Sequence, residues 1–221
     1  MIEVGDVEAR VAGIRSRIKA AGGGDRVRLV AVTKGFGADA ARAAVAAGVG
    51  DVGENYAQEL VAKATDPSTV GARWHFIGRL QRNKVRMVAP HVSLWQSVDR
   101  EALVAEIGRR APGAAILIQV NVTGQDEKGG CAPADLGQLL AAARGHDLTV
   151  AGLMAVGPGG PPEAARAPFR TLVGLADQLG LEERSIGMTD DLEVAVEEGS
   201  TMVRVGRALF GERPRSSRPG H

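Results

Sequence analysis

The chain has 221 residues, of which 44% are hydrophobic, 24% are charged and 3% are aromatic. This composition excludes a disordered or fibrous protein and is sufficient for one sizeable hydrophobic core. The 27 Lys and Arg residues nearly balance the 26 Asp and Glu residues, and the formal net charge is +1. We therefore expect no general attraction to nucleic acid or to an anionic membrane, so that any anionic ligand must be bound by local groups.

The sequence contains no pattern typical of secretion or of a membrane span. Its first residues lack the basic start and apolar run of a secretion signal, and no window reaches the roughly 18 uncharged apolar residues of a span. The single cysteine, Cys131, cannot form an internal disulfide, and no activating His lies near it in the sequence. We expect a cytoplasmic protein, and a monomer because no heptad repeat or long apolar surface helix is present.

The first element in chain order is an amphipathic helix over 4–21, in which Val7, Val11, Ile14 and Ile18 recur at three- and four-residue steps. After it, short apolar runs rich in β-branched residues alternate with helical patterns. The predicted strands cover 28–32, 50–53, 74–78, 94–98, 115–122, 149–156, 185–188 and 202–206. The predicted helices between the strands cover 38–48, 55–65, 80–89, 99–110, 133–144, 162–179 and 190–199.

Apolar strands separated by helices indicate a parallel sheet that is buried on both faces. Eight strand–helix units favour a single-domain α/β fold, a closed (β/α)8 TIM-like barrel with an additional N-terminal helix, over an open doubly wound sheet. The strands at 50–53 and 185–188 are short and contain glycine, so a seven-stranded or irregular barrel is the alternative. We expect the barrel to cover 1–212, a loop at 157–162, and a mobile polar tail at 213–221.

Polar residues directly after each strand are the functional candidates, because sites in such barrels lie at the carboxyl ends of the strands. Lys34 follows the first apolar run. A lysine that emerges from a packed strand into a barrel mouth is partly desolvated, which favours a nucleophilic amine able to form a Schiff base. The alternative is a solvated lysine that opens a loop.

The last two predicted strands add groups suited to an anionic ligand. Gly206 and Arg207 form a turn into a short helical segment, where backbone amides can bind phosphate, and Thr189 offers a hydroxyl or simply caps a helix. Period-two alternation points Arg204 into the barrel among apolar neighbours. There the guanidinium needs a partner, either a carboxylate or a ligand acceptor such as a pyridine nitrogen.

Seven motifs in a fixed order, spanning about residues 5–212, resemble those of one family. They are AVTK (31–34), GENYAQE (53–59), WHFIGRLQRNK (74–84), QVN (119–121), GLM (152–154), GMTDD (187–191) and GSTMVRVG (199–206), with FG at 210–211. The chain resembles the YggS/PROSC family, the pyridoxal 5′-phosphate (PLP) homeostasis proteins. That family has a barrel similar to the N-terminal domain of alanine racemase, the fold type III group.

The resemblance implies that Lys34 carries the PLP aldehyde as a Schiff base and that Arg204 faces the pyridine nitrogen. A cation there disfavours protonation of that nitrogen, which leaves the ring a poor electron sink. The other cofactor-binding residues that the resemblance implies are Thr189, Gly206 and Arg207 at the phosphate and Asn55, His75 and Met188 around the ring. Thr189 stands where the family usually has Ser and keeps the hydroxyl.

The same resemblance implies a non-catalytic protein that buffers PLP or delivers it to PLP-dependent apoenzymes or vitamin B6 salvage enzymes. The alternative is a fold type III amino-acid racemase, which needs an acid–base group on each face of the cofactor. In alanine racemase the second group is a tyrosine from another domain, whereas Tyr56, the sole tyrosine here, lies in the GENY motif. A Schiff-base aldolase fits the lysine and phosphate turn alone, but Arg204 and the ordered motifs argue against it.

Two further patterns complete the sequence-based expectations. The four His residues and one Cys show no metal-ligand spacing, so we expect no metal site. Arg79, Arg82, Lys84 and Arg86 form a basic stretch after the third strand. It is interpreted as a solvated helix face, or as a docking point for a phosphorylated ligand or an acidic partner.

Overall fold

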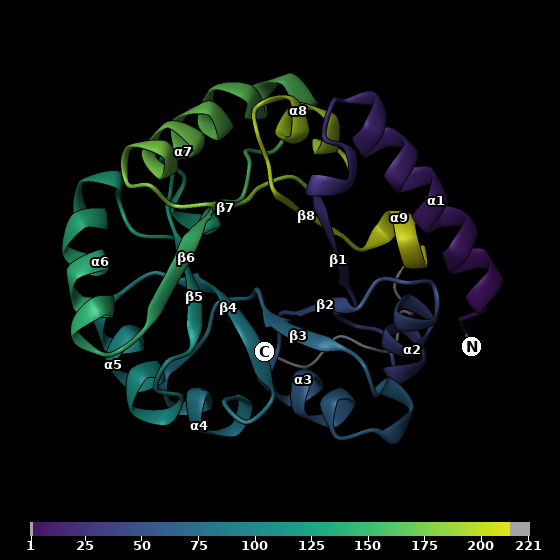
Figure 1. Cartoon of the computed structure of the whole chain (residues 1–221), viewed down its shortest axis with the longest axis horizontal. Coiled ribbons are helices and arrows are strands. Elements are labelled where there is room, and N and C mark those ends of the chain that lie inside the picture. Colours follow the sequence, from purple (N-terminus) through teal and green to yellow (C-terminus); the bar gives the residue numbers. More distant parts are fainter. Residues whose placement is uncertain (1, 213–221) are drawn as a thin grey trace.

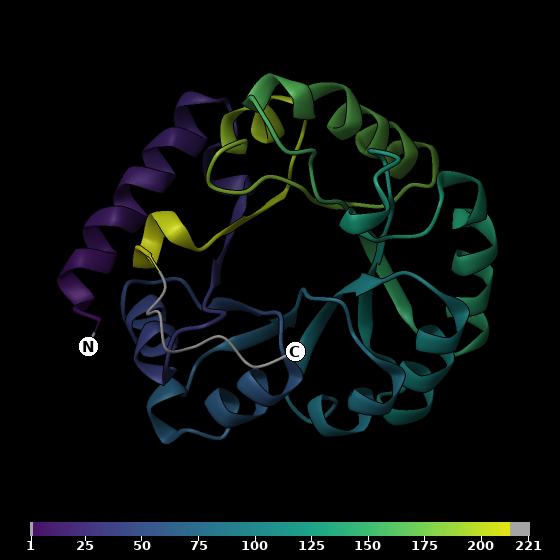
Figure 2. The same ribbon diagram turned by 180° about the vertical axis from the view of Figure 1, so that it is seen from behind.

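The computed structural model describes residues 2–212, and the predicted mobile tail at 213–221 lies outside the described residues. Eight parallel strands close into a barrel in chain order, and helices surround it (Figures 1 and 2). The strands are β1 (Arg28–Val32), β2 (Asp51–Glu54), β3 (Arg73–Phe76), β4 (Val92–Val98), β5 (Ala115–Gln119), β6 (Thr149–Met154), β7 (Glu183–Ser185) and β8 (Met202–Val205). The predicted (β/α)8 barrel is confirmed.

The helices largely follow the predicted order. They are α1 (Val4–Ala20), α2 (Ala38–Ala46), α3 (Ala57–Ala64), α4 (Val85–Val88), α5 (Glu101–Arg110), α6 (Leu136–Gly145), α7 (Arg166–Gln178), α8 (Leu192–Glu197) and α9 (Arg207–Phe210). The helix predicted over 80–89 is instead a 3-10 turn (Arg82–Lys84) followed by the single turn of α4. The buried face of α1 consists of Val7, Val11, Ile14 and Ile18, as its spacing predicts.

The strand boundaries differ from prediction mainly at β5 and β7. The strand predicted over 115–122 ends at Gln119, after which Val120 forms only an isolated bridge with Cys131. The strand predicted over 185–188 spans Glu183–Ser185 instead, because Gly187 adopts a φ of +96° that a strand does not accommodate. The seam between β7 and β8 has one registered pair, Ser185 with Met202, so the closed barrel is least regular there.

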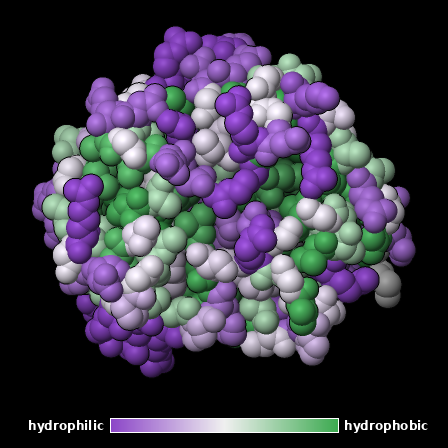
Figure 3. Space-filling view, viewed as in Figure 1, coloured by the Kyte–Doolittle hydropathy of each residue, from purple (hydrophilic) through white to green (hydrophobic). Residues whose placement is uncertain are grey.

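The barrel interior combines a small apolar cluster with buried polar groups. Val30, Leu94, Leu117, Met154 and Met202 form the interior cluster, whereas the alternate strand residues pack beneath the helices. Polar residues lie over the middle of the face shown in Figure 3. Within residues 2–212, no helix has both the length and the apolar character to cross a bilayer.

Candidate functional site

Four neighbouring strands carry most of the predicted site residues at their carboxyl ends. Lys34 follows β1, Asn55 follows β2, and Thr189 lies in the loop after β7, while Gly206 directly follows β8. The closed order of the barrel places β7, β8, β1 and β2 side by side. A Cβ atom added to Gly206 would lie 3.1 Å from the carbonyl oxygen of Val32, so the ends of β8 and β1 approach closely.

Arg204 lies inside the barrel, as the alternation in β8 predicts, and is 5% exposed. Its Nη1 donates to both the carbonyl oxygen and the Oγ of Ser185, each at 2.6 Å, and its Nη2 donates to the carbonyl oxygen of Ala155 at 2.8 Å. Burial lowers the pKa of Arg204 to about 10, while Asp191 acts in the opposite direction. The guanidinium therefore remains a cation at neutral pH, and within the described chain no carboxylate forms an ion pair with it.

A chain of hydrogen bonds runs from Arg204 across the barrel interior. Ser185 Oγ accepts from Arg204 and donates to Gln96 Oε1 at 2.7 Å. Gln96 Nε2 lies 2.7 Å from His75 Nδ1, and His75 Nε2 lies 3.1 Å from Asp51 Oδ1. With Gln96 Nε2 as donor, His75 accepts on Nδ1 and donates from Nε2, so each group finds a complementary partner.

His75 therefore lies deep in the barrel rather than in a loop at its mouth. It is 2% exposed, and both ring nitrogens are engaged by strand residues, Gln96 of β4 and Asp51 of β2. Its role around a PLP ring remains a prediction. The hydrogen-bonded path to Arg204 gives it an indirect link to the site.

Asp51 anchors the amino-terminal end of this path. Burial raises its pKa, but hydrogen bonds with His75 and Arg73, together with the charge of Arg73, outweigh burial and hold the pKa of Asp51 well below its ordinary value. The pair with Arg73 is bidentate, at 2.8 and 2.9 Å. A buried carboxylate with two nitrogen partners is compatible with the barrel interior, because its charge is balanced locally.

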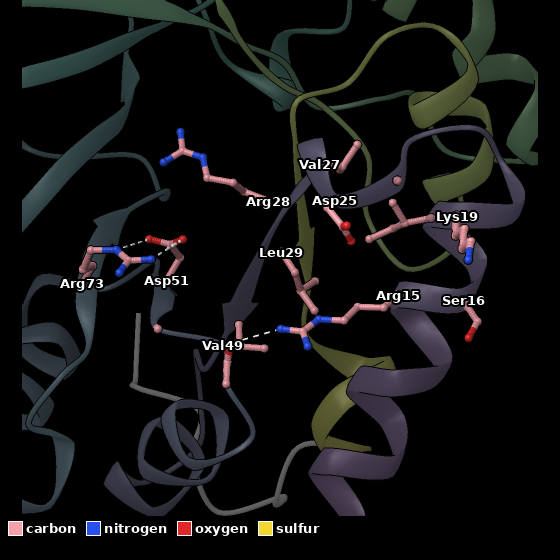
Figure 4. Close-up of a pocket in the computed structure, with 14 residues that line it drawn as sticks. Arg15, Ser16, Lys19, Asp25, Val27, Arg28, Leu29, Val49, Asp51 and Arg73 are labelled. Carbon is pink, nitrogen blue, oxygen red and sulfur yellow. Dashed lines mark hydrogen bonds and ion pairs between the residues drawn. The ribbon is translucent and has the colours of Figure 1, made fainter.

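The amino ends of the strands also border a pocket of about 450 Å³, here the amino-face pocket (Figure 4). Its arginines are already bonded to the protein. Arg15 Nη2 donates to the carbonyl oxygen of Gly48 at 3.0 Å, and Arg28 pairs with Glu183 at 2.6 Å, while Arg73 pairs with Asp51. These cations therefore help to hold the barrel base together.

A buried ionic cluster supports the loop that carries Lys34. Lys63 Nζ donates to Glu54 Oε1 at 2.5 Å and to the carbonyl oxygen of Thr33 at 2.8 Å. Thr33 Oγ1 donates to Glu54 Oε1 at 2.6 Å, and Glu59 Oε2 accepts from the backbone N–H of Gly35 at 2.7 Å. These bonds hold the residues on both sides of Lys34, which is itself half-buried. Burial raises the pKa of Glu54, against the influence of Lys63.

The loop after β7 is held by α1 and by its own buried carboxylate. Asp191 Oδ1 accepts from the backbone N–H of Met188 at 2.6 Å. Arg17 of α1 donates from Nη2 to the carbonyl oxygen of Thr189 at 2.9 Å and pairs with Glu193. The backbone of the predicted phosphate-binding residue is thus fixed, while Met188 is 38% exposed.

The turn after β8 leaves backbone amides available at its start. The first amide bonded within this turn is that of Leu209, which donates to the carbonyl oxygen of Gly206 at 2.9 Å. The amides of Arg207 and Ala208 precede it, and such groups at a helical start suit an anion. The Arg207 side chain is exposed and pairs with Asp190. Arg207 therefore offers its backbone N–H to an anion at this turn, as Gly206 does, and not its side chain.

Asn55 provides a polar atom that requires a partner. Its Oδ1 is buried, and no atom of residues 2–212 forms a hydrogen bond with it. A bound donor would remove the cost of this unsatisfied acceptor, which is typically about 1–3 kcal/mol. An incoming ligand with a hydroxyl or N–H group therefore fits this position.

Two other candidates do not contribute reactive groups to the site. Burial raises the pKa of Cys131 to about 11, so that its thiol is protonated at neutral pH. In the described part of the chain, no three His, Cys, Asp or Glu side chains cluster in a way that would hold a metal ion. The chemistry of the site therefore rests on an amine, a guanidinium, a hydroxyl and backbone amides.

Most of the supporting residues carry little signal in the sequence. Gln96 follows the apolar Leu94 and Trp95 in β4, and that interruption was the available signal, whereas Ser185 ends a strand whose other residues, Glu183 and Arg184, are also polar. Asp51 opens β2 and was predicted only as part of a strand. Lys63 gave no signal, because a lysine within an amphipathic helix is ordinarily solvated.

Comparison with known proteins identifies the family. The family model for the alanine racemase N-terminal domain matches residues 2–214. The pyridoxal phosphate homeostasis protein of Pseudomonas aeruginosa is 43% identical over 195 residues, covering 85% of each chain. The structure of PipY from Synechococcus elongatus with PLP bound is 33% identical, with a TM-score of 0.83 over 93% of this chain and 100% of that chain.

A more distant structure supports the fold alone. Alanine racemase from Corynebacterium glutamicum is 14% identical, with a TM-score of 0.74, and the match covers 99% of this chain but 63% of the racemase. The match covers 85% of the P. aeruginosa protein and 100% of PipY, against 63% of the racemase. The chain therefore belongs to the alanine racemase N-terminal domain family and, within it, to the pyridoxal phosphate homeostasis proteins.

Proposed function

We propose that this protein binds PLP through Lys34 and buffers it or delivers it to other proteins, without robust catalytic activity of its own. The observation that carries the proposal is the placement of Lys34, Thr189, Arg204 and Gly206 in or directly after the adjacent strands β1, β7 and β8. The bound PLP in the 33% identical PipY structure supports the same ligand.

The residues present fit a flat, phosphorylated aldehyde. Lys34 Nζ would supply the amine that condenses with the aldehyde, with the loss of one water molecule. Thr189 and the amides of Gly206 and Arg207 would hold the phosphate, and Arg204 would face the ring nitrogen. The unsatisfied Oδ1 of Asn55 would accept a hydrogen bond from the ligand. Met188 and His75 complete the proposed set, His75 through its link to Arg204.

The environment of Arg204 supports storage rather than catalysis. PLP accelerates amino-acid chemistry when its ring accepts electrons, and a protonated ring nitrogen increases that capacity. Arg204 remains a cation, fixed by Ser185 and Ala155, so a second positive charge beside it is unfavourable. We infer that the ring is bound in a form with little electron-accepting capacity.

The runner-up activity, amino-acid racemisation, lacks a comparable supporting feature. Tyr56 is the chain's sole tyrosine, is 44% exposed and stands at the N-terminus of α3. Incubation of the PLP-loaded protein with L-alanine, followed by chiral chromatography, tests this activity. We expect no D-alanine at enzyme-like rates, and its rapid appearance would overturn the non-catalytic proposal.

PLP binding is tested by titrating the purified chain with PLP and following the visible absorption band. We expect a saturable band in the wild type, its loss in Lys34→Ala, and its retention in Lys19→Ala, which removes a lysine at the opposite end of the barrel. A normal band in Lys34→Ala would contradict the assignment.

Delivery is tested by mixing the PLP-loaded protein with a PLP-dependent apoenzyme, which should regain activity. We expect the protein to act as a monomer in the cytosol.

A further inference from the structure

A second pocket lies on the carboxyl side of the barrel, and most of its lining residues are not among those assigned to PLP. It has a volume of about 700 Å³ and lies among the loops that follow β2, β3 and β4. We call it the rim pocket and define it by Asn55, Tyr56, Gln58, Arg79, Lys84 and Arg100. Asn55 is the one residue that it shares with the proposed PLP site.

The rim pocket contains two cations that the protein does not neutralise. Arg100 is bonded to Asp99 and donates from Nη2 to the carbonyl oxygen of Leu80 at 2.6 Å. By contrast, neither Arg79 nor Lys84 forms a hydrogen bond or ion pair through its side chain with any residue in 2–212. The pocket therefore carries an excess of two positive charges.

The amino-face pocket differs from the rim pocket in how its arginines are bonded. There Arg15, Arg28 and Arg73 are each bonded to a carbonyl oxygen or a carboxylate of the chain. An anion that contacted these arginines would have to compete with their partners, and the remaining cation of the lining, Lys19, shares the pocket with the carboxylate of Asp25. At the rim pocket an anion would meet Arg79 and Lys84 without displacing a protein group.

The neutral lining indicates the kind of molecule that carries the anion. Tyr56 is 44% exposed and lines the same pocket as the two cations, and Gln58 adds an amide. An aromatic ligand that stacks on the ring of Tyr56 gains roughly 0.5–1.5 kcal/mol beyond the energy expected from the area that it buries. A phosphate monoester carries a charge of about −1.5 to −2 at neutral pH, which matches two unpaired cations better than a carboxylate does.

We propose that the rim pocket is a binding site for a phosphate monoester of a small aromatic compound. Arg79 would contact the phosphate through its planar guanidinium, Lys84 would add a second charge, and Tyr56 would stack on the ring. This ligand is separate from the PLP molecule proposed at Lys34. This proposal therefore interprets the basic stretch 79–86 as a docking point for a phosphorylated ligand.

The test measures phenyl phosphate binding by calorimetry at low ionic strength, with the wild-type protein first saturated with PLP so that the Lys34 site is filled. We expect one saturable site, and binding at least tenfold weaker in the Arg79→Gln/Lys84→Gln double variant. The matched control is Arg82→Gln/Arg86→Gln, which removes the same charge from exposed residues of the same stretch that do not line the pocket. We expect its affinity to stay within twofold of wild type.

Three results would overturn the proposal: no saturable binding to the wild type, equal weakening in the two double variants, or equally tight binding of benzoate. The first removes the site, the second indicates only a general basic field, and the third indicates a carboxylate site. Binding is also expected to persist in Lys34→Ala, and its loss there would assign the probe to the PLP site. If PLP did not bind to Lys34, phenyl phosphate binding could still be measured, so each of the two proposals can be refuted independently of the other.

Discussion

Ser185 accepts a hydrogen bond from the buried Arg204 on its Oγ and a second on its carbonyl oxygen, both at 2.6 Å. This one residue, at the end of the short β7, thereby fixes the guanidinium through two different atoms. Its hydroxyl also donates to Gln96, which extends the contact toward His75 and Asp51. The orientation of the cation proposed to face PLP therefore depends on strand residues on the opposite side of the barrel.

Replacing Ser185 with Ala should weaken PLP binding about tenfold, equivalent to about 1.4 kcal/mol. The variant removes one hydrogen bond of Arg204 and leaves Gln96 Oε1 without its donor, so the free energy of unfolding should also fall by about 1–3 kcal/mol. Visible-band titration with PLP and urea denaturation measure the two effects.

Ser97→Ala is the matched control for that variant. Ser97 is also buried, and its Oγ donates to the carbonyl oxygen of Gly78 at 2.5 Å, away from Arg204. It should lower stability while leaving PLP affinity within twofold of wild type. Equal losses of affinity in the two variants would argue against a positioning role for Ser185.

Lys63→Met should destabilise the fold by about 3–5 kcal/mol, because it leaves Glu54 buried without its cation. Adding Glu54→Gln should recover a large part of that loss, since the uncompensated charge is then removed. Urea denaturation of the wild type, both single variants and the double variant checks this coupling. Purely additive losses would show that the two side chains do not stabilise one another.

Acid should remove a specific contribution of Asp51 to stability. Its pKa is lower in the folded state than its ordinary value of 3.8, so its contribution is present above about pH 3.8 and is lost as the pH falls below that value. Asp51→Asn should therefore be less stable than the wild type at pH 7, with a gap that narrows at lower pH. Asp25→Asn, on the same face, controls for the loss of one negative charge. A gap that stays constant down to pH 3 would contradict the prediction.

The sequence predicted the barrel well, because inward-facing and outward-facing positions alternate along each strand and this alternation is visible in the pattern of residue types. Residues 28–32 have the same bounds as β1, and Arg204 points inward as its apolar neighbours suggest. The seventh strand was harder to place, because its end depends on the left-handed backbone of Gly187. The lone seam pair of Ser185 and Met202 likewise depends on how the barrel closes.

The supporting residues were less predictable, because their role arises from contacts between distant strands. Gln96 and Ser185 are 89 residues apart, and His75 and Asp51 are 24 apart. Lys63 is buried only because Glu54 and the carbonyl of Thr33 receive its charge. Such compensation becomes visible only when the strands and helices are placed together.

The most direct test of the central claim is to find which nitrogen bonds to the cofactor. The PLP-loaded protein is reduced with borohydride, digested, and mapped by mass spectrometry. We predict that the pyridoxyl label lies on Lys34 with about one label per chain. A label spread over exposed lysines, or located on a residue other than Lys34, would contradict the account.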